Sequence, residues 1–169
     1  MRSEALKEHI ETLPHRALLM SAGLKKEDFE LDKPFIGVAN SYNNIIPGHI
    51  HLNVLTQEVK RGIRDAGGVP LEWGVPGVCD GVAMYVEMRL SLPSREHIAA
   101  NIEIMTLSHS LDGWVGVTNC DKITPGMLMA AGRLNLPAIM LTGGPMKANV
   151  KPFIGVANSY NNIIPGHIH

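Results

Sequence analysis

Cysteine is scarce in this chain, which has two among its 169 residues. Two cysteines are too few for a scaffold held together by disulfides, so a reduced, cytoplasmic setting is expected. Neither sign of charge is in excess: the chain has 15 Lys and Arg and 16 Asp and Glu, so its net charge is −1. Because no basic run occurs either, the sequence argues against the positively charged surface by which proteins bind nucleic acids.

Long apolar segments and phosphate-binding motifs are also missing. No apolar run reaches the roughly 20 residues of a membrane-spanning helix, and charges interrupt the N-terminal segment, so neither a membrane anchor nor a signal peptide is expected. The patterns GxxxxGK[ST] and GxGxxG are absent, so nucleotide binding has no support. The composition, 45% hydrophobic and 18% charged, is typical of a globular domain that buries a core.

Short apolar runs alternate with segments of helical periodicity. The runs predicted to be buried strands are 34–40, 69–73, 114–118 and 138–142. The predicted helices are 3–13, 14–23, 52–66, a helix capped by Ser94 and one that begins at Pro125, whereas 74–92 is predicted to be a loop. This alternation predicts an α/β fold in three layers, a mainly parallel sheet with helices on both faces.

Polar side chains follow the predicted strands, at the edge where open α/β sheets bind ligands. They include Cys79 and Asp80 after the second strand, and Cys120, Asp121 and Lys122 after the third. Thiolates favour iron–sulfur clusters and carboxylates favour Mg²⁺, so one hypothesis is a metal centre. The alternative is that the cysteines are small buried residues, the aspartates cap loops or helices, and Lys122 is an ion-pair partner.

Two histidines follow the first strand. In an extended chain His49 and His51 would share a face, and such a pair is one element of a zinc site. No cysteine or carboxylate pair stands nearby at zinc spacing. We therefore expect these histidines to form hydrogen bonds or to pack at the mouth of the sheet.

Several phrases occur together that are specific to one family. They are "PHRALL", "KPFIGVANSYNNIIPGHIHL", "AGGVP", "CDGVAM", "SLPSRE", "NCDKITPGMLMAAGRLNLP" and "TGGPM". In this order and spacing, residues 2–147 resemble the N-terminal part of the dihydroxy-acid and phosphogluconate (sugar-acid) dehydratase family. We therefore expect residues 1–150 to be a truncated dehydratase-like N-terminal α/β domain.

The resemblance implies a hydro-lyase that converts a 2,3-dihydroxy carboxylate to a 2-keto acid, in branched-chain amino-acid synthesis or in sugar-acid breakdown. It implies an Fe–S cluster, [2Fe–2S] or [4Fe–4S], and a Mg²⁺ ion. Cys120 resembles a cluster ligand, and Cys79 is a candidate for a further thiolate. Asp80, Asp121 and Lys122 resemble Mg²⁺ ligands, with Lys122 as a catalytic carbamate. Full-length members are expected to be homodimers.

Departures from the family pattern limit what this chain is expected to do alone. Many members have a cysteine where this chain has Gly48, while others have glycine. The family is several times longer, and its third cluster cysteine, a Mg²⁺-binding glutamate and a serine base lie beyond the resemblance. We therefore expect the isolated chain to be inactive, and the alternative function is a non-catalytic α/β fragment or interaction module.

The segment at 33–51 is repeated, letter for letter, at 151–169. Diverged repeats preserve a pattern and not every letter, so a repeat architecture is not indicated. We interpret the second copy as an artefact of cloning or gene assembly, with a recent natural duplication and strand swap as the alternative. Since the first copy leads directly into the helix at 52–66, we predict that the first copy occupies the strand position in the sheet.

Overall fold

The structure, a computed structural model, describes residues 1–85 and 87–146. Its centre is a four-stranded, entirely parallel sheet in the order β2-β1-β3-β4. The strands are β1 (Phe35–Asn40), β2 (Val69–Gly74), β3 (Gly113–Thr118) and β4 (Ala138–Thr142). All four lie where the apolar runs predicted them, and the two inner strands, β1 and β3, are buried along almost their whole length, as central parallel strands are.

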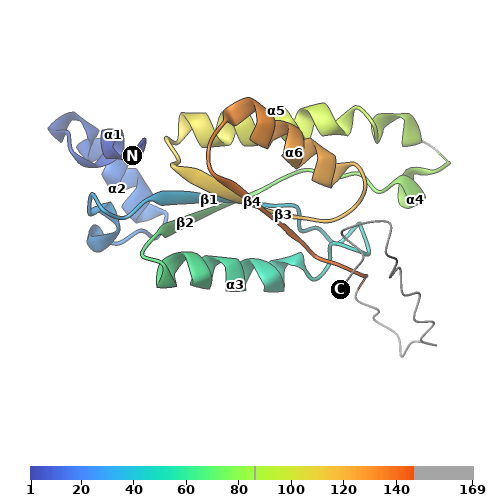
Figure 1. Cartoon of the computed structure of the whole chain (residues 1–169), viewed down its shortest axis with the longest axis horizontal. Coiled ribbons are helices and arrows are strands. Elements are labelled where there is room, and N and C mark those ends of the chain that lie inside the picture. The colour runs from blue at the N-terminus through green and yellow to red at the C-terminus, as the bar shows by residue number, and fades with distance from the viewer. Residues whose placement is uncertain (86, 147–169) are drawn as a thin grey trace, which may run out of the picture.

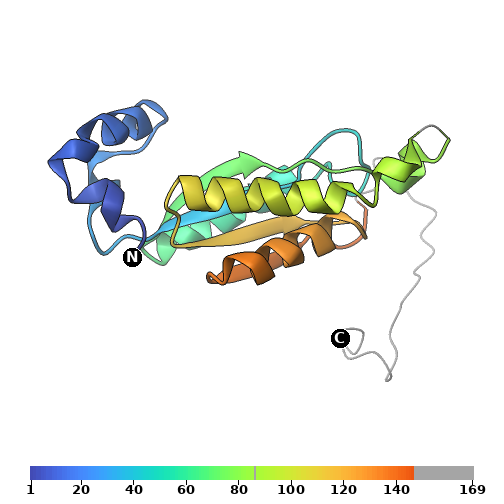
Figure 2. The same ribbon diagram turned by 90° about the horizontal axis from the view of Figure 1, so that it is seen from above.

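Helices cover both faces of the sheet (Figure 1). Helix α3 (Leu52–Asp65) lies on one face, while α5 (Ser94–Ser108) and α6 (Ile123–Leu134) pack together on the other, as Figure 2 shows from above. The predicted three-layer α/β fold is therefore confirmed. Among the described residues, none of the helices combines the length and the apolar character that crossing a bilayer requires.

The N-terminal segment corrects one prediction. The single helix predicted over 3–13 is instead α1 (Glu4–Lys7) and a 3-10 turn, η1 (Ile10–Thr12). His9 between them has extended backbone angles and Ile10 is 78% exposed, so the predicted apolar stripe is broken after Leu6, which still packs against the cluster around Phe35. Helix α2 (Leu13–Ser21) and a second turn, η2 (Lys26–Phe29), complete this segment.

The stretch predicted to be a loop, 74–92, contains two short elements. They are α4 (Asp80–Ala83) and the turn η3 (Met88–Leu90). Elements of three or four residues are too short to show a periodicity, which is why the sequence did not reveal them. Ser94 is the first residue of α5 and does not cap it, since Pro93 occupies the cap position and makes no side-chain cap bond.

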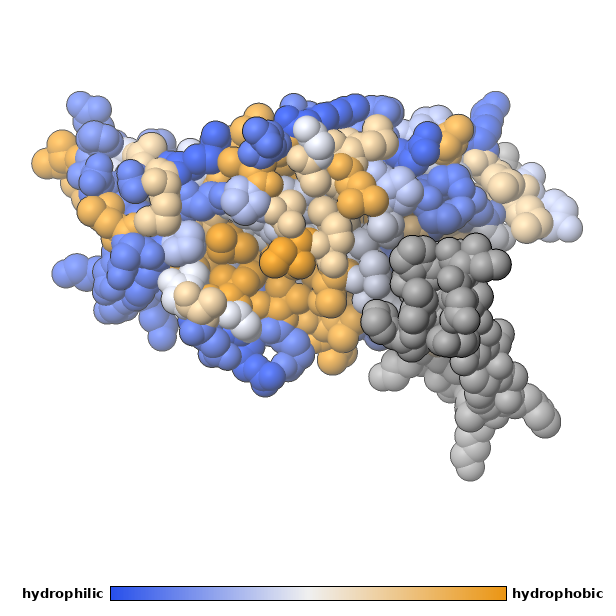
Figure 3. Space-filling view, in the orientation of Figure 1, coloured by the Kyte–Doolittle hydropathy of each residue, from blue (hydrophilic) through white to orange (hydrophobic). Residues whose placement is uncertain are grey.

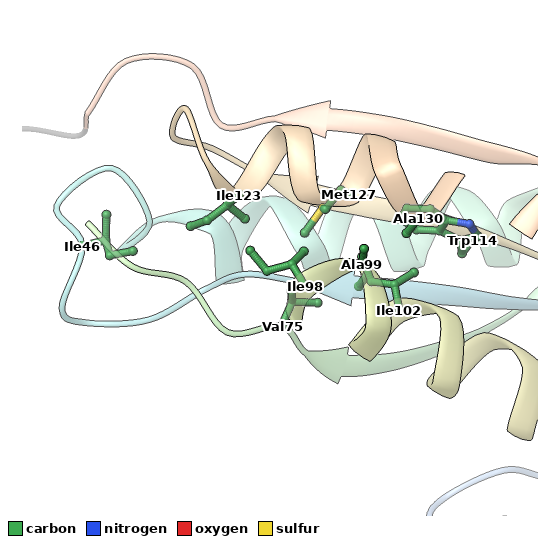
Figure 4. Close-up of a cluster of buried hydrophobic side chains, with 10 residues drawn as sticks. Ile46, Val75, Ile98, Ala99, Ile102, Trp114, Ile123, Met127 and Ala130 are labelled. Atoms are coloured by element: carbon green, nitrogen blue, oxygen red, sulfur yellow. The ribbon is translucent and has the colours of Figure 1, made fainter. Parts of the chain in front are cut away.

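The largest cluster of buried side chains lies between the sheet and helices α5 and α6 (Figure 4). Ile98 and Ile102 from α5 meet Met127 from α6 and Trp114 from β3, and each is almost fully buried. Burying one such side chain contributes about 1.5–3 kcal/mol before the entropy cost. Gly126 permits the close approach of the two helices, because a Cβ there would lie 2.9 Å from the Ile98 side chain.

The first copy of the duplicated segment supplies the inner strand β1. It pairs with β2 from Phe35↔Val69 to Asn40↔Gly74, and with β3 from Ile36↔Gly113 to Asn40↔Val117. Leu52, at the start of α3, is buried against the sheet with Val38 and Val117. The first copy therefore occupies the strand position, as predicted. The prediction for the second copy, 151–169, lies outside the described residues.

Asp112 fastens the N-terminal segment and β1 to the start of β3. Its carboxylate accepts hydrogen bonds from the backbone N–H of Ser3 at 3.0 Å and of Phe35 at 2.8 Å. Burial alone would raise the pKa of Asp112, but hydrogen bonds from Ser3 and Phe35 outweigh burial and lower the pKa. The ionised carboxylate is therefore the form that the fold prefers.

Replacing Asp112 by alanine should destabilise the chain by about 1–3 kcal/mol, because two N–H groups lose their acceptor. A carboxyl whose pKa is lowered by folding stabilises above its unfolded pKa of about 3.9, and this stability is lost as the pH falls. In urea unfolding, Asp112→Ala should therefore differ most from wild type near neutral pH and less below about pH 4. The exposed Asp32→Ala is the control, and an equal loss in both variants would contradict the role given to Asp112.

Candidate functional site

The carboxyl ends of β1 and β3 lie side by side, and the chain leaves them on opposite faces of the sheet. After β1 it continues to α3, and after β3 it enters α6 on the other face. Such a change of direction opens a crevice beyond the strand ends, which is where open α/β sheets bind ligands. The loops that border this crevice are 41–51 after β1 and 119–122 after β3.

Three of the predicted site residues meet in space. The Lys122 ammonium lies 3.0 Å from Oδ2 of Asp80 and 2.5 Å from Oδ2 of Asp121. Two carboxylates more than roughly 10 Å apart could not bind the same metal ion. Here both carboxylates contact one nitrogen, so they lie far closer together than this limit. The predicted convergence is confirmed, whereas the role of these residues as metal ligands stays a prediction.

Ser91 fixes the second oxygen of Asp80. Its hydroxyl donates a hydrogen bond to Oδ1, and Ser91 is 2% exposed, so the donor is shielded from water. The Ser91 hydrogen bond, followed by the one from Lys122, lowers the pKa of Asp80. Hydrogen bonds to Asp121 and Asp80 raise the pKa of Lys122. In this arrangement the Lys122 ammonium and the Asp80 carboxylate are ionised at neutral pH.

Both cysteines are half-buried free thiols beside this ion-pair cluster, and both pack against the core under α5 and α6. Burial, reinforced by nearby Cys79 and by the carboxylates of Asp121 and Asp80, raises the pKa of the Cys120 thiol. Cys120 also has a φ of +65°, in the left-handed region that side chains other than glycine rarely adopt. Backbone strain of this kind concentrates at functional sites.

The two histidines are held by backbone carbonyls. Nδ1 of His49 donates to Ser41 O at 2.7 Å, and Nε2 of His51 donates to Gly143 O at 2.9 Å. His49 is fully buried, and burial lowers its pKa despite the opposing hydrogen bond to Ser41, so the neutral ring is favoured. Both rings therefore have the hydrogen-bonding role that we expected from the sequence.

Asn119 ties two loops of the site together. Its amide nitrogen donates to Gly48 O and to Gly144 O, each at 2.9 Å, so the loop after β1 is joined to the turn after β4. A Cβ at Gly48 would lie 3.4 Å from this nitrogen, in ordinary van der Waals contact. The position where many family members have cysteine therefore lies directly against the residue that precedes Cys120.

Sequence reasoning missed the parts played by Ser91 and Asn119. Ser91 belongs to the phrase "SLPSRE" and Asn119 to the phrase "NCDKITPGMLMAAGRLNLP", and for these two residues both phrases indicated only the family. Within residues 1–85 and 87–146, no group of three or more His, Cys, Asp or Glu side chains converges as a metal site would require. The cluster of Asp80, Asp121 and Lys122 instead places one lysine cation between two carboxylates.

The sequence of this chain matches a known protein family and several curated proteins. The family model for the N-terminal domain of dihydroxy-acid/6-phosphogluconate dehydratases matches residues 33–150. The chain belongs to this family. The match includes the whole sheet and all five residues predicted for the metal centre.

Similar proteins include the dihydroxy-acid dehydratase of Caldanaerobacter subterraneus subsp. tengcongensis, 58% identical over 151 residues, which are 89% of this chain and 27% of that protein. The enzymes of the same name from Acetivibrio thermocellus and Archaeoglobus fulgidus are 57% and 58% identical over 147 residues, 86% of this chain and 26% of each relative. The chain thus spans about a quarter of the length of the curated relatives it matches.

The strain at Cys120 leads to a stability prediction. Glycine adopts a positive φ without the roughly 1–2 kcal/mol that other residues lose there, whereas serine keeps the strain. Cys120→Gly should therefore be more stable than Cys120→Ser by about 1 kcal/mol in urea unfolding, although both lack the thiol. A serine variant as stable as the glycine variant would show that the backbone at position 120 is not strained.

Proposed function

We propose that this chain is the N-terminal portion of a dihydroxy-acid dehydratase and supplies part of its Mg²⁺ site through Asp80, Asp121 and Lys122. The observation that carries the proposal is the meeting of two carboxylates on one lysine, beyond the ends of β1 and β3. Support also comes from the relatives at 56–58% identity, which are named dihydroxy-acid dehydratases. The reaction would remove water from a 2,3-dihydroxy carboxylate and give a 2-keto acid.

The donor set fits Mg²⁺. Carboxylate oxygens are the ligands that this ion prefers, and a cation, the Lys122 ammonium, already lies between the two carboxylates. An ammonium cannot bind a metal ion, but a carbamate can. Its formation requires that the ammonium lose a proton, that the free amine bond to CO₂, and that a second proton leave. The side chain then changes from +1 to −1, and three anionic groups surround the position of the cation.

Each residue then has a task in holding or orienting the reactants. Asp80, Asp121 and a Lys122 carbamate would hold the ion, and Ser91 keeps Oδ1 of Asp80 occupied while Oδ2 contacts Lys122. When bound there, Mg²⁺ would supply positive charge that attracts the substrate carboxylate and makes the neighbouring 2-proton more acidic. His49 and His51, with one ring nitrogen each on a carbonyl, keep the loop after β1 in place.

An iron–sulfur cluster does not fit this chain alone. The sequence has two cysteines, whereas the resemblance implies three cluster thiolates. Cys79 and Cys120 lie next to the ion pairs of Asp80 and Lys122, where ligands of an iron–sulfur cluster would be needed. A third thiolate has to come from elsewhere. We therefore propose these two thiols as part of a cluster site and derive no step of the reaction from the cluster.

A sugar acid is the alternative substrate, since the family description includes 6-phosphogluconate dehydratases. We favour the dihydroxy-acid branch, and with it branched-chain amino-acid synthesis, because the curated relatives named above are dihydroxy-acid dehydratases. The isolated chain is not expected to catalyse this reaction. Because it spans about a quarter of these relatives, we propose that alone it is a non-catalytic fragment.

The metal proposal is tested by titrating the chain with Mg²⁺ in bicarbonate buffer and measuring affinity by calorimetry. Asp80→Asn should abolish binding, and Ser91→Ala should weaken it by about 10–100-fold, the usual cost of losing a residue that orients a ligand. Ser108→Ala, at the exposed end of α5, is the matched control. Unchanged affinity in Asp80→Asn would overturn the metal site, and unchanged affinity in Ser91→Ala would overturn only the orienting role.

The activity of the isolated chain is tested with 2,3-dihydroxyisovalerate and with 6-phosphogluconate, after reconstitution with iron, sulfide and Mg²⁺. We expect no 2-keto acid, since the third cysteine, the glutamate and the serine base of the family are missing. Turnover by the pure 169-residue chain would contradict this expectation. In that case Cys120→Ser should abolish the activity, because the cluster would lose a thiolate while the loop kept its size.

A further inference from the structure

Among the described residues, no helix covers the β4 half of the sheet on the face that carries α3. A groove of about 490 Å³ runs between α3 and the β3–β4 side of the sheet. It is lined by Val59 and Ile63 from α3, by Val115 from β3 and by Ile139 and Leu141 from β4. Figure 3 shows apolar side chains gathered over β4 and next to α3, on the side of the molecule that faces the viewer.

The chemistry of the lining restricts what can bind there. Every residue in contact with the groove is Pro, Gly, Ala, Val, Ile or Leu, so no side chain offers a charge or a hydrogen bond. Sites for metabolites have a few polar groups that orient the ligand, and this groove has none. An apolar surface of this kind fits the apolar side chains of another protein segment.

The two faces of the sheet are covered unequally. Within residues 1–85 and 87–146, helices α5 and α6 together cover one face, whereas α3 is the helix that packs on the other, against β1, β2 and β3. Ile139, on β4, is 68% exposed. Parallel sheets are found almost exclusively with both faces covered by helices. The bare half of this face therefore lacks a covering layer among the residues described.

We propose that a helix from the polypeptide that follows this region in the full-length relatives packs into the groove, parallel or antiparallel to α3. About three quarters of the length of those relatives lies outside the matched region, which leaves ample chain to supply it. Helices pack 8–10 Å apart, so a helix beside α3 would lie directly over Ile139 and Leu141. The proposal rests on family membership and on the exposed surface, not on the metal chemistry.

The handedness of the connections indicates which kind of helix this is. The crossover from β3 to β4 places α6 on the α5 face, and crossovers of parallel strands are right-handed. A further strand added outside β4 would again place its connecting helix on the α5 face. The helix in the groove is therefore not the connection to a strand outside β4. The second copy, 151–169, does not suit the position because its apolar run, "PFIGVAN", has the pattern of a strand.

The proposal is tested by making one substitution in two proteins. In the 169-residue chain, Ile139→Glu should change Tm by no more than about 2 °C, because the side chain is exposed. In the full-length Caldanaerobacter relative, glutamate placed at the position that aligns with Ile139 should lower Tm by at least about 5 °C, because the charge would be buried. If the glutamate variant of the full-length protein fails to fold, the alanine variant takes its place. Alanine adds no charge and should lower Tm by a smaller amount.

Val54→Glu is the matched control, since Val54 is 60% exposed on α3 and lies outside the groove. It should be tolerated in both proteins. Equal Tm changes for Ile139→Glu in the short chain and in the full-length relative would overturn the proposal. A dimer of the short chain, detected by light scattering and dissolved by Ile139→Glu, would also overturn it, because a second copy would then be the occupant.

Discussion

The parallel pairing of β1 with β3 is the contact on which the rest of the molecule depends. It joins segments that are more than 70 residues apart in sequence, from Ile36↔Gly113 to Asn40↔Val117. The pairing places two strand ends next to each other and sends the chain to opposite faces beyond them. Asp112 anchors one end of this pairing through the Phe35 N–H, and Ser41 anchors the other by donating to Val117 O. The site is built on a rigid edge as a result.

Stability and chemistry make opposite demands at the site. The core under α5 and α6 is packed closely enough for a Cβ at Gly126 to collide with Ile98, and it supplies the rigidity. Above it, Cys120 has an unfavourable backbone conformation and a thiol whose pKa is raised by burial. Neither property helps the chain to fold. Both make sense if the position of the sulfur relative to the Asp80–Lys122 cluster matters more than local stability.

Much of this arrangement was predictable from the sequence, for definite reasons. Buried parallel strands are continuous apolar runs, so β1 to β4 were found, and the rule that ligands bind at the carboxyl ends predicted that Asp80 and Lys122 would meet across 42 residues. The break at His9 was missed because an extended residue within an amphipathic pattern leaves no sign in the periodicity. The Ser91 contact was missed because it depends on the path of 80–94, which contains only short elements.

The lysine between the two carboxylates has a consequence for the order in which the protein is assembled. Two aspartates facing an empty crevice would repel each other and oppose folding, but the Lys122 ammonium neutralises much of that repulsion. Lys122 thus acts as an internal counterion that helps to bring these loops together. Under the proposed metal chemistry, assembly would be an exchange, in which this internal cation is converted to an anionic carbamate and a Mg²⁺ ion takes its place.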